Sequence, residues 1–213
     1  MSWETAWDEL DASWQVALSL AWEAYGNATI PFGAALADAT GAVVAEGRNR
    51  VYESAAPPRQ LAGSLLAHAE VNALVTLDPE RRYEDHVLTT SLEPCLLCLG
   101  ATVMATVGRI RYAGADPYGG GDGGLLGTNP HVERLPLALE GPRRDPFGRL
   151  ASGLLVAFFL ERKPDGHVVR AFGDRTPELV DLARALLATG MRAWAAQGVG
   201  LPEVLPALWP ELG

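Results

Sequence analysis

His68-Ala69-Glu70 and, further along, Glu93-Pro94-Cys95-Leu96-Leu97-Cys98 are the two segments around which this chain is organised. Both lie within the stretch from Leu66 to Met104, which holds the only two cysteines of the sequence. One imidazole and two thiolates are ligands that zinc prefers, and three protein ligands leave the fourth tetrahedral position free for water. The sequence therefore predicts a catalytic site that holds one Zn²⁺ per chain through His68, Cys95 and Cys98.

Glu70 lies two residues after the histidine, where its carboxylate can exchange protons with water on the metal without being a ligand. Zinc lowers the pKa of bound water from 15.7 to about 7, which provides hydroxide at neutral pH. Attack on a ring carbon that bears an exocyclic amine must be followed by loss of ammonia, which leaves only after protonation. Glu70 can carry that proton, so we expect it to be the catalytic acid and base.

The alternative is a structural zinc site whose fourth ligand comes from His86, His131 or His167. Structural sites usually fill all four positions with cysteine and histidine. None of the three histidines stands in a metal-ligand spacing, and this alternative gives Glu70 no role.

Composition bounds the class of protein. The chain has 213 residues, which is enough for one domain with an appendage. Its net charge of −9 creates an electrostatic field that repels polyanions. We therefore expect a small-molecule substrate and no extensive nucleic-acid partner.

With both cysteines assigned to the metal, a reducing compartment is expected. The N-terminus does not resemble a secretory signal, and the longest apolar run, Gly153 to Leu160, is too short to span a membrane. These features predict a soluble, cytoplasmic protein.

Helix and strand patterns alternate in the first half of the chain. They predict a helix over Trp7–Tyr25, a hairpin of Pro31–Asp38 and Ala42–Gly47, a helix over Ala67–Leu77 with His68 in its first turn, a strand over His86–Ser91, a helix from Pro94 as first residue to Thr106, and a strand over Arg109–Ala113. This order favours an α/β fold in which at least the later strands are parallel.

The second half is less regular. Gly114–Gly127 is glycine-rich but lacks the lysine of a phosphate-binding loop, so a lid or connector is expected. Thr128–Arg149 carries four prolines and is interpreted as an extended linker. Leu150–Gly213 is expected to be mostly helical, with helices over the apolar run Leu154–Leu160 and over Thr176–Ala196, and with Pro202, Pro206 and Pro210 breaking the tail into short pieces.

The chain resembles the cytidine deaminase superfamily, in the branch of bacterial guanine deaminase, fungal-type cytosine deaminase and the tRNA adenosine deaminases. The matching segments are Pro31–Ala34, Gly47–Arg50, His68–Leu74, Ser91–Ala101 and Arg109–Asp116. The resemblance implies a three-layer α/β/α sandwich with a mixed central sheet, assembled as a homodimer or larger. We place a zinc-dependent deaminase domain at 1–128. A linker and helical extension at 129–213 would pack on that domain or at a dimer interface.

The resemblance also implies substrate-binding residues. Asn49 would hydrogen-bond the base, Phe32 would lie beside the pocket, and the backbone N–H of Ala69 would bind a ring carbonyl. Asp116 matches an acidic residue that reaches the ligand in some branches. The alternatives are that Asn49 is an ordinary turn residue and that Asp116 only caps a loop.

Three functions are compatible with these features. The first is hydrolytic deamination of a small nucleobase, nucleoside or related heterocycle, as in guanine and cytosine deaminases. The second is deamination of adenosine in tRNA. Against it stand the acidic charge and the segment after Asp116, where Pro117-Tyr118 and glycines replace the Lys-Thr-Gly or similar run of those enzymes. The third is a non-catalytic zinc-binding or regulatory protein, which the presence of Glu70 argues against.

Overall fold

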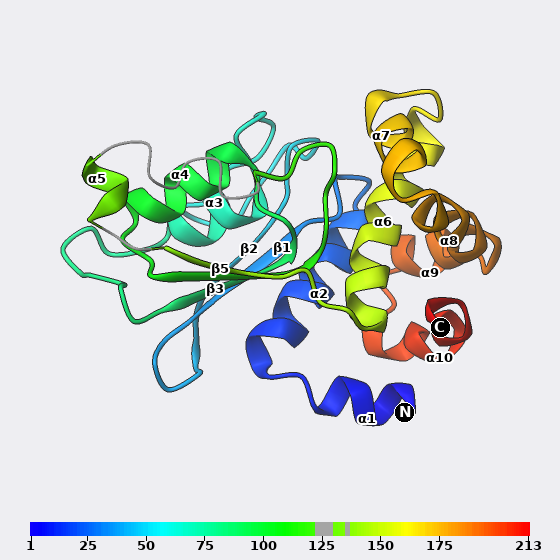
Figure 1. Cartoon of the computed structure of the whole chain (residues 1–213), viewed down its shortest axis with the longest axis horizontal. Coiled ribbons are helices and arrows are strands. Elements are labelled where there is room, and N and C mark those ends of the chain that lie inside the picture. Colours follow the sequence, from blue (N-terminus) through cyan, green and yellow to red (C-terminus); the bar gives the residue numbers. More distant parts are fainter. Residues whose placement is uncertain (122–129, 135–136) are drawn as a thin grey trace.

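The computed structural model describes residues 1–121, 130–134 and 137–213. Within these residues the sheet has five strands in the order β2-β1-β3-β4-β5. Strand β1 pairs antiparallel with β2 and β3, whereas β3, β4 and β5 pair in parallel, so the sheet is mixed as predicted (Figure 1). The strands are β1 Gly33–Ala37, β2 Val43–Arg48, β3 Val87–Leu92, β4 Arg109–Gly114 and β5 Ala138–Glu140.

Helices cover both faces of the sheet, which confirms the α/β/α sandwich. Helices α3 (Ala69–Leu74) and α4 (Leu96–Met104) lie on one face, and α2 (Ala12–Gly26) and α6 (Pro146–Arg162) on the other (Figure 1). Two hydrophobic cores correspond to these layers. Leu36 and Ile110 belong to the α3–α4 core, and the α2–α6 core holds the largest set of buried side chains.

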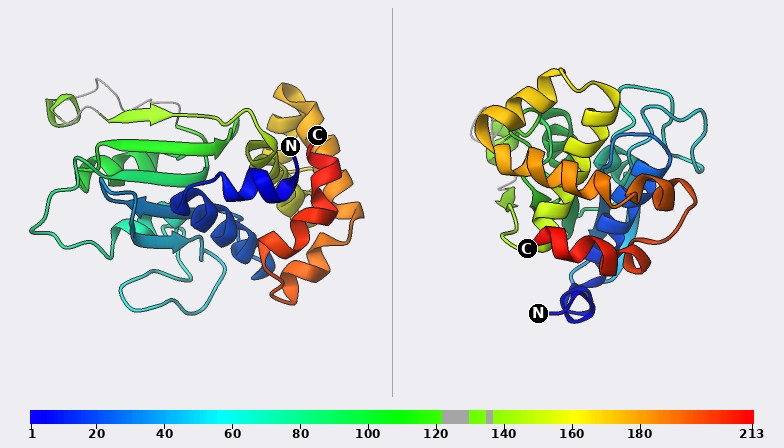
Figure 2. Two further views of the ribbon diagram at one scale, coloured as in Figure 1. Left: turned by 90° about the horizontal axis from the view of Figure 1, so that it is seen from below. Right: turned by 90° about the vertical axis from the view of Figure 1, so that its right-hand side faces the viewer.

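The C-terminal helices extend the α2–α6 layer and share its core. They are α7 His167–Arg175, α8 Pro177–Ala188, α9 Met191–Ala196 and α10 Leu201–Leu212. Figure 2 shows them grouped beyond one end of the sheet, with α1 (Trp3–Asp8) against α10. The apolar run Leu154–Leu160 is helical, as predicted, and most of it is buried. No helix in the described part of the chain is long and apolar enough to cross a membrane.

The linker predicted over Thr128–Arg149 is wrong in its described part. This segment contains α5 (Pro130–Glu133), strand β5 and the start of α6. Strand β5 has only three residues and pairs with β4 at the sheet edge, from Arg109 opposite Ala138 to Arg111 opposite Glu140. So short a strand has no period that a sequence pattern can detect, and the surrounding prolines favoured an irregular segment.

Helix boundaries also differ from the prediction. Pro206 and Pro210 lie inside the continuous helix α10, whose buried leucines pack on α6 and α8 and offset the cost of the prolines. The helix predicted to run to Ala196 ends at Ala188, because Gly190 adopts φ +82° and starts a new direction. The first predicted helix is two helices, and Asp11 caps the second by accepting from the N–H groups of Ser13 and Trp14.

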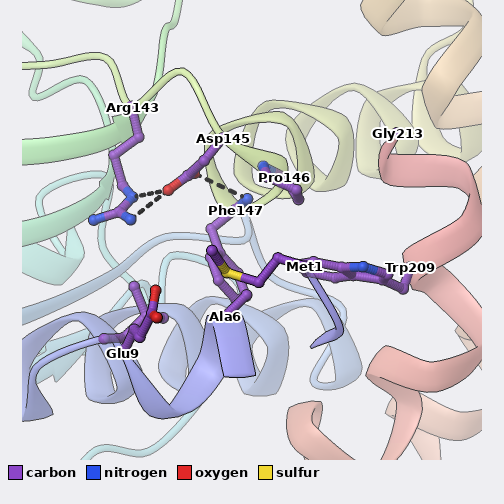
Figure 3. Close-up of a pocket in the computed structure, with 10 residues that line it drawn as sticks. Met1, Ala6, Glu9, Arg143, Asp145, Pro146, Phe147, Trp209 and Gly213 are labelled. Atoms are coloured by element: carbon purple, nitrogen blue, oxygen red, sulfur yellow. Dashed lines mark hydrogen bonds and ion pairs between the residues drawn. The ribbon is translucent and has the colours of Figure 1, made fainter. Parts of the chain in front are cut away.

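A cavity of about 440 Å³ lies where α1, α6 and α10 meet, near both chain ends (Figure 3). Phe147, Trp209 and Met1 form its apolar walls. Two of its three charged side chains, Arg143 and Asp145, pair with each other, and Asp145 also caps α6. The third is Glu9. This cavity shares no lining residue with the one at the predicted metal ligands.

Candidate active site

The structure brings the three predicted zinc ligands together. His68 is the N-cap of α3, Cys95 is the N-cap of α4, and Cys98 lies in the first turn of α4. His68 therefore precedes its helix instead of lying in the first turn, and Pro94 stands before the cap instead of at the first helical position. Among the described residues, these three form the group of His, Cys, Asp or Glu side chains that could hold a metal ion.

The distances among the ligand atoms fit a tetrahedral zinc ion. The Cys95 and Cys98 Sγ atoms are 3.6 Å apart, and His68 Nδ1 lies 3.6 Å from the first and 3.4 Å from the second. Zinc bonded to sulfur at about 2.3 Å and to nitrogen at about 2.0 Å places two sulfurs about 3.8 Å apart and sulfur and nitrogen about 3.5 Å apart. The three atoms thus occupy one face of a coordination tetrahedron of the right size.

The electrostatics of the group favour a cation. A hydrogen bond from Cys98, together with His68, lowers the pKa of Cys95 to about 4, so Cys95 is a thiolate at neutral pH. The bond that Cys98 makes to this thiolate, together with burial, raises the pKa of Cys98. Both cysteines also stand at the N-terminus of α4, where the helix dipole stabilises negative charge.

Glu70 lies in the first turn of α3 and is only 1% exposed. Within the described structure neither of its carboxylate oxygens has a hydrogen-bond partner, and burial raises its pKa. A buried carboxyl group without partners is costly, and native structures rarely retain one without a role. Its position beside the ligand group fits a zinc site in which water, placed in the fourth position, would serve as its partner.

A cavity of about 200 Å³ opens onto this group. Six of the eight predicted site residues line it, namely Phe32, Asn49, His68, Glu70, Cys95 and Asp116. Cys98 lies behind them and is fully buried, and Ala69 is buried as the first residue of α3. Seven further residues complete the walls, and the sequence analysis assigned none of them to a pocket: Ile30, Glu93, Tyr118, Gly119, Leu155, Phe159 and Val168.

The C-terminal extension supplies part of the cavity wall. Leu155 and Phe159 come from α6 and Val168 from α7. Helix α7 also holds the loop after β4, because Arg175 donates to the carbonyl of Pro117 (2.7 Å) and its His167 ring lies parallel to that of Tyr118 with centroids 6.4 Å apart. Leu155, Phe159 and Val168 belong to no sequence motif, so only the packing of α6 and α7 shows that they line the cavity.

Asp116 both caps a turn and lines the cavity. Its Oδ1 accepts from the N–H groups of Tyr118 and Gly119, and its own N–H donates to Glu93. Burial raises the pKa of Asp116, and the two N–H donors oppose this shift. Asp116 therefore caps the loop through Oδ1, as the alternative held. Because the residue also lines the cavity, it can still contact a ligand there.

Helix α3 is positioned by a close approach to β2 at Gly47. A β carbon at this position would lie 2.4 Å from both the carbonyl oxygen of Ala69 and the nitrogen of Ala73. Gly47→Ala is therefore expected to displace α3 together with His68 and Glu70. We expect it to lower the free energy of unfolding by about 1–3 kcal/mol and to lower the zinc content. Chemical denaturation and metal analysis would measure both.

Gly173 in α7 is the matched control, because a β carbon there would meet no atom within 4 Å apart from the backbone of its own helix turn. Gly173→Ala should keep the zinc content and gain up to about 1 kcal/mol in helix stability. Equal losses in the two variants would show that the close approach at Gly47 does not position α3.

The fold and the site together are those of the zinc-binding deaminase family. Residues 8–114, half of the chain, match the cytidine and deoxycytidylate deaminase zinc-binding region, and the chain belongs to this family. Membership agrees with the resemblance noted in the sequence and with zinc as the metal of the His68, Cys95 and Cys98 group.

Individual relatives differ in what they act on. The chain is 36% identical over 155 residues to a tRNA(Ile)-lysidine synthase of Deinococcus radiodurans, a match that covers 67% of this chain and 25% of that protein. It is 39% identical over 86 residues to guanine deaminase of Bacillus subtilis, which covers 39% of this chain and 49% of that protein. The chain thus spans about a quarter and about half of the lengths of these relatives.

Among solved structures, one comes from studies of A-to-I editing by tRNA:A34 deaminases at the wobble position of transfer RNA. It superposes with a TM-score of 0.50 and 27% identity, and the match covers 66% of this chain and all of that one.

Proposed function

We propose that this protein is a zinc-dependent hydrolytic deaminase that converts the exocyclic amine of a small nucleobase, nucleoside or related heterocycle to a carbonyl and releases ammonia. The observation that carries the proposal is the buried, unpartnered carboxylate of Glu70 beside three zinc-type ligands in one cavity. Membership of the zinc-binding deaminase family supports the same chemistry.

Zinc held by His68, Cys95 and Cys98 would lower the pKa of a bound water to about 7. The Glu70 carboxylate would take a proton from the attacking water and deliver it to the departing amine nitrogen, so that ammonia is the leaving group. Burial suits this role, because it raises the pKa of Glu70 and stabilises the protonated form between the two transfers.

The remaining residues would bind the ring. The N–H of Ala69 belongs to the first turn of α3, where helix N–H groups lack intrahelical acceptors, and it can donate to a ring carbonyl. Asp116 offers an acceptor on the cavity wall. Phe32 and the side chains of α6 and α7 provide apolar walls that hold a flat ring and exclude water. A cavity of about 200 Å³ is smaller than the roughly 300–1,000 Å³ of typical ligand pockets, and this size favours one small heterocycle.

Ammonia release tests the proposal. Zinc-loaded protein would be assayed with guanine, cytosine, adenine and their nucleosides, with the Glu70→Ala protein as the blank. We expect turnover of at least one of these compounds above the blank. No turnover of any of them would contradict the substrate class.

A second candidate is deamination of adenosine in tRNA, favoured by the 27% identity to the tRNA:A34 deaminase structure. A base flipped out of a nucleic acid can occupy a pocket as small as a free base does. The net charge of −9 opposes this candidate, because the protein field repels the phosphate backbone. Conversion of adenosine to inosine in tRNA at moderate salt, without turnover of free bases, would select it.

We also propose that the chain forms a homodimer through the outer face of α3 and α4. Val75 and Met104 are exposed apolar side chains that line a groove of about 500 Å³, together with charged residues of the loop after α3. Leu96, in the first turn of α4, is also exposed. Met104 is 70% exposed, and exposed apolar surface with a polar rim favours an association site.

Met104→Glu should place a charge in that interface and convert the dimer to a monomer, as measured by light scattering during size-exclusion chromatography. Gln197→Glu adds the same charge at an exposed position in the C-terminal helices and should leave the dimer intact. A monomeric parent protein, or a Met104→Glu variant that stays dimeric, would contradict this assignment.

We further propose a reducing, cytoplasmic location. Both cysteines are free thiols within the metal-ligand group, and an oxidising compartment would threaten them with disulfide formation.

A further inference from the structure

The amide of Asn49 is held in one orientation by the chain itself. Asn49 follows β2, is 2% exposed and lines the cavity. Its Oδ1 accepts from the backbone N–H of Val51 at 3.1 Å and from the hydroxyl of Thr29 at 2.8 Å. A backbone N–H can only donate, so the amide atom that faces Val51 must be the oxygen and not the nitrogen.

Thr29 is itself fixed. It is fully buried, and its hydroxyl oxygen accepts from the N–H of Tyr52 at 3.4 Å, which leaves the hydroxyl hydrogen directed at Asn49. The backbone of Asn49 is also held, because its N–H donates to the carbonyl of Phe32 at 2.9 Å. A chain of donors thus runs from Tyr52 through Thr29 to Asn49.

The consequence concerns the other end of the amide. Both lone pairs of Oδ1 are used by the protein, and in the described part of the chain the Nδ2 group has no hydrogen-bond partner, although Asn49 borders the cavity. An NH₂ group that borders the cavity and lacks partners in the protein favours a ligand that accepts from it. The amide is therefore presented as a donor only.

We infer that Thr29 is a positioning residue that locks the Asn49 amide with its NH₂ toward the cavity. The site thereby selects heterocycles that present a hydrogen-bond acceptor there, either a carbonyl oxygen or an unprotonated ring nitrogen. This inference rests on the proposed function for the substrate, but the lock is a property of the protein alone. An amide free to rotate would accept either a donor or an acceptor and lose this discrimination.

A double-mutant cycle tests whether Thr29 acts through Asn49. Thr29→Val keeps the shape and removes the hydroxyl, whereas Thr29→Ser keeps the hydroxyl. With the best compound of the ammonia-release assay, we expect Thr29→Val to lower kcat/KM by about 10-fold, chiefly through KM, and Thr29→Ser to stay within about 3-fold of the parent. In an Asn49→Ala background, Thr29→Val should change kcat/KM by less than about 3-fold. Equal effects in both backgrounds would overturn the inference, because a merely structural role is additive.

A second measurement does not depend on turnover. The side-chain amide signals of Asn49 in a ¹⁵N-labelled, zinc-loaded sample can be assigned by their loss in Asn49→Ala. We expect these signals to shift or broaden in Thr29→Val and to stay in place in Thr29→Ser. Unchanged signals in Thr29→Val would overturn the lock even if the enzyme is active. Changed signals in a protein that turns over no compound would support the lock and contradict only the proposed substrate class.

Discussion

Replacing Glu70 with glutamine is expected to lower kcat by about 10²–10⁴-fold while the zinc content stays at one ion per chain. Glutamine has nearly the same shape as glutamate but cannot carry a proton between water and the leaving nitrogen. Folding should survive, because the replaced carboxyl group is buried and makes no hydrogen bond in the described structure. Ammonia release and metal analysis on the same preparation would measure both quantities.

Glu161→Gln makes the same chemical change on α6, where the carboxylate accepts from the hydroxyl of Tyr25 outside the cavity. This control should stay within about 2-fold of the parent activity. If Glu70→Gln keeps full activity, the proton carrier is another group, and a binding or regulatory role for the zinc site gains support.

Replacing Cys98 with serine is expected to remove the zinc. Cys98 is fully buried, and its sulfur forms one corner of the ligand triangle. A serine hydroxyl is a much weaker zinc ligand than a cysteine thiolate, so two ligands would remain. Zinc at 100 times its dissociation constant stabilises the parent by about 2.7 kcal/mol, and the variant should lose this gain. Metal analysis and thermal unfolding with and without zinc would show both losses.

Variants of the three remaining histidines are the controls for the expected loss of zinc in the Cys98→Ser protein. His86 pairs with Asp85, and His167 lies against Tyr118 on α7, so neither belongs to the ligand group. The side chain of His131 lies outside the described residues. We expect His86→Ala, His131→Ala and His167→Ala to keep one zinc ion per chain. Loss of zinc in any one of them would point to a fourth protein ligand and a structural site.

The ligand group could be predicted from the sequence because metal chemistry restricts it to a few residue types at short spacing. His68 and Glu70 lie two residues apart at the start of α3, and Cys95 and Cys98 lie three apart at the start of α4, so the short spacing already keeps each pair together. Strand β3 was likewise predictable from its apolar and β-branched residues, and β4 was predicted with nearly its observed bounds. Family membership confirms zinc as the metal and the fold confirms the strands, whereas the role of each ligand residue stays a prediction.

The parts that escaped prediction depend on contacts between distant segments. Val168 and Phe159 reach the cavity because α6 and α7 pack against the sheet, and nothing in their own sequence marks them. Thr29 stands 20 residues from Asn49 and belongs to no motif, so its hydroxyl contact became visible only in the fold. Strand β5 was missed for a related reason, because its pairing with β4 and not its composition makes it a strand.

X-ray absorption at the zinc edge of the loaded parent protein tests the central claim most directly. The arrangement of His68, Cys95 and Cys98 predicts two sulfur neighbours at about 2.3 Å, one imidazole nitrogen at about 2.0 Å and one further light atom that belongs to no histidine. A second imidazole in the coordination shell, or zinc bound by fewer than two sulfurs, would contradict an open catalytic site at this position.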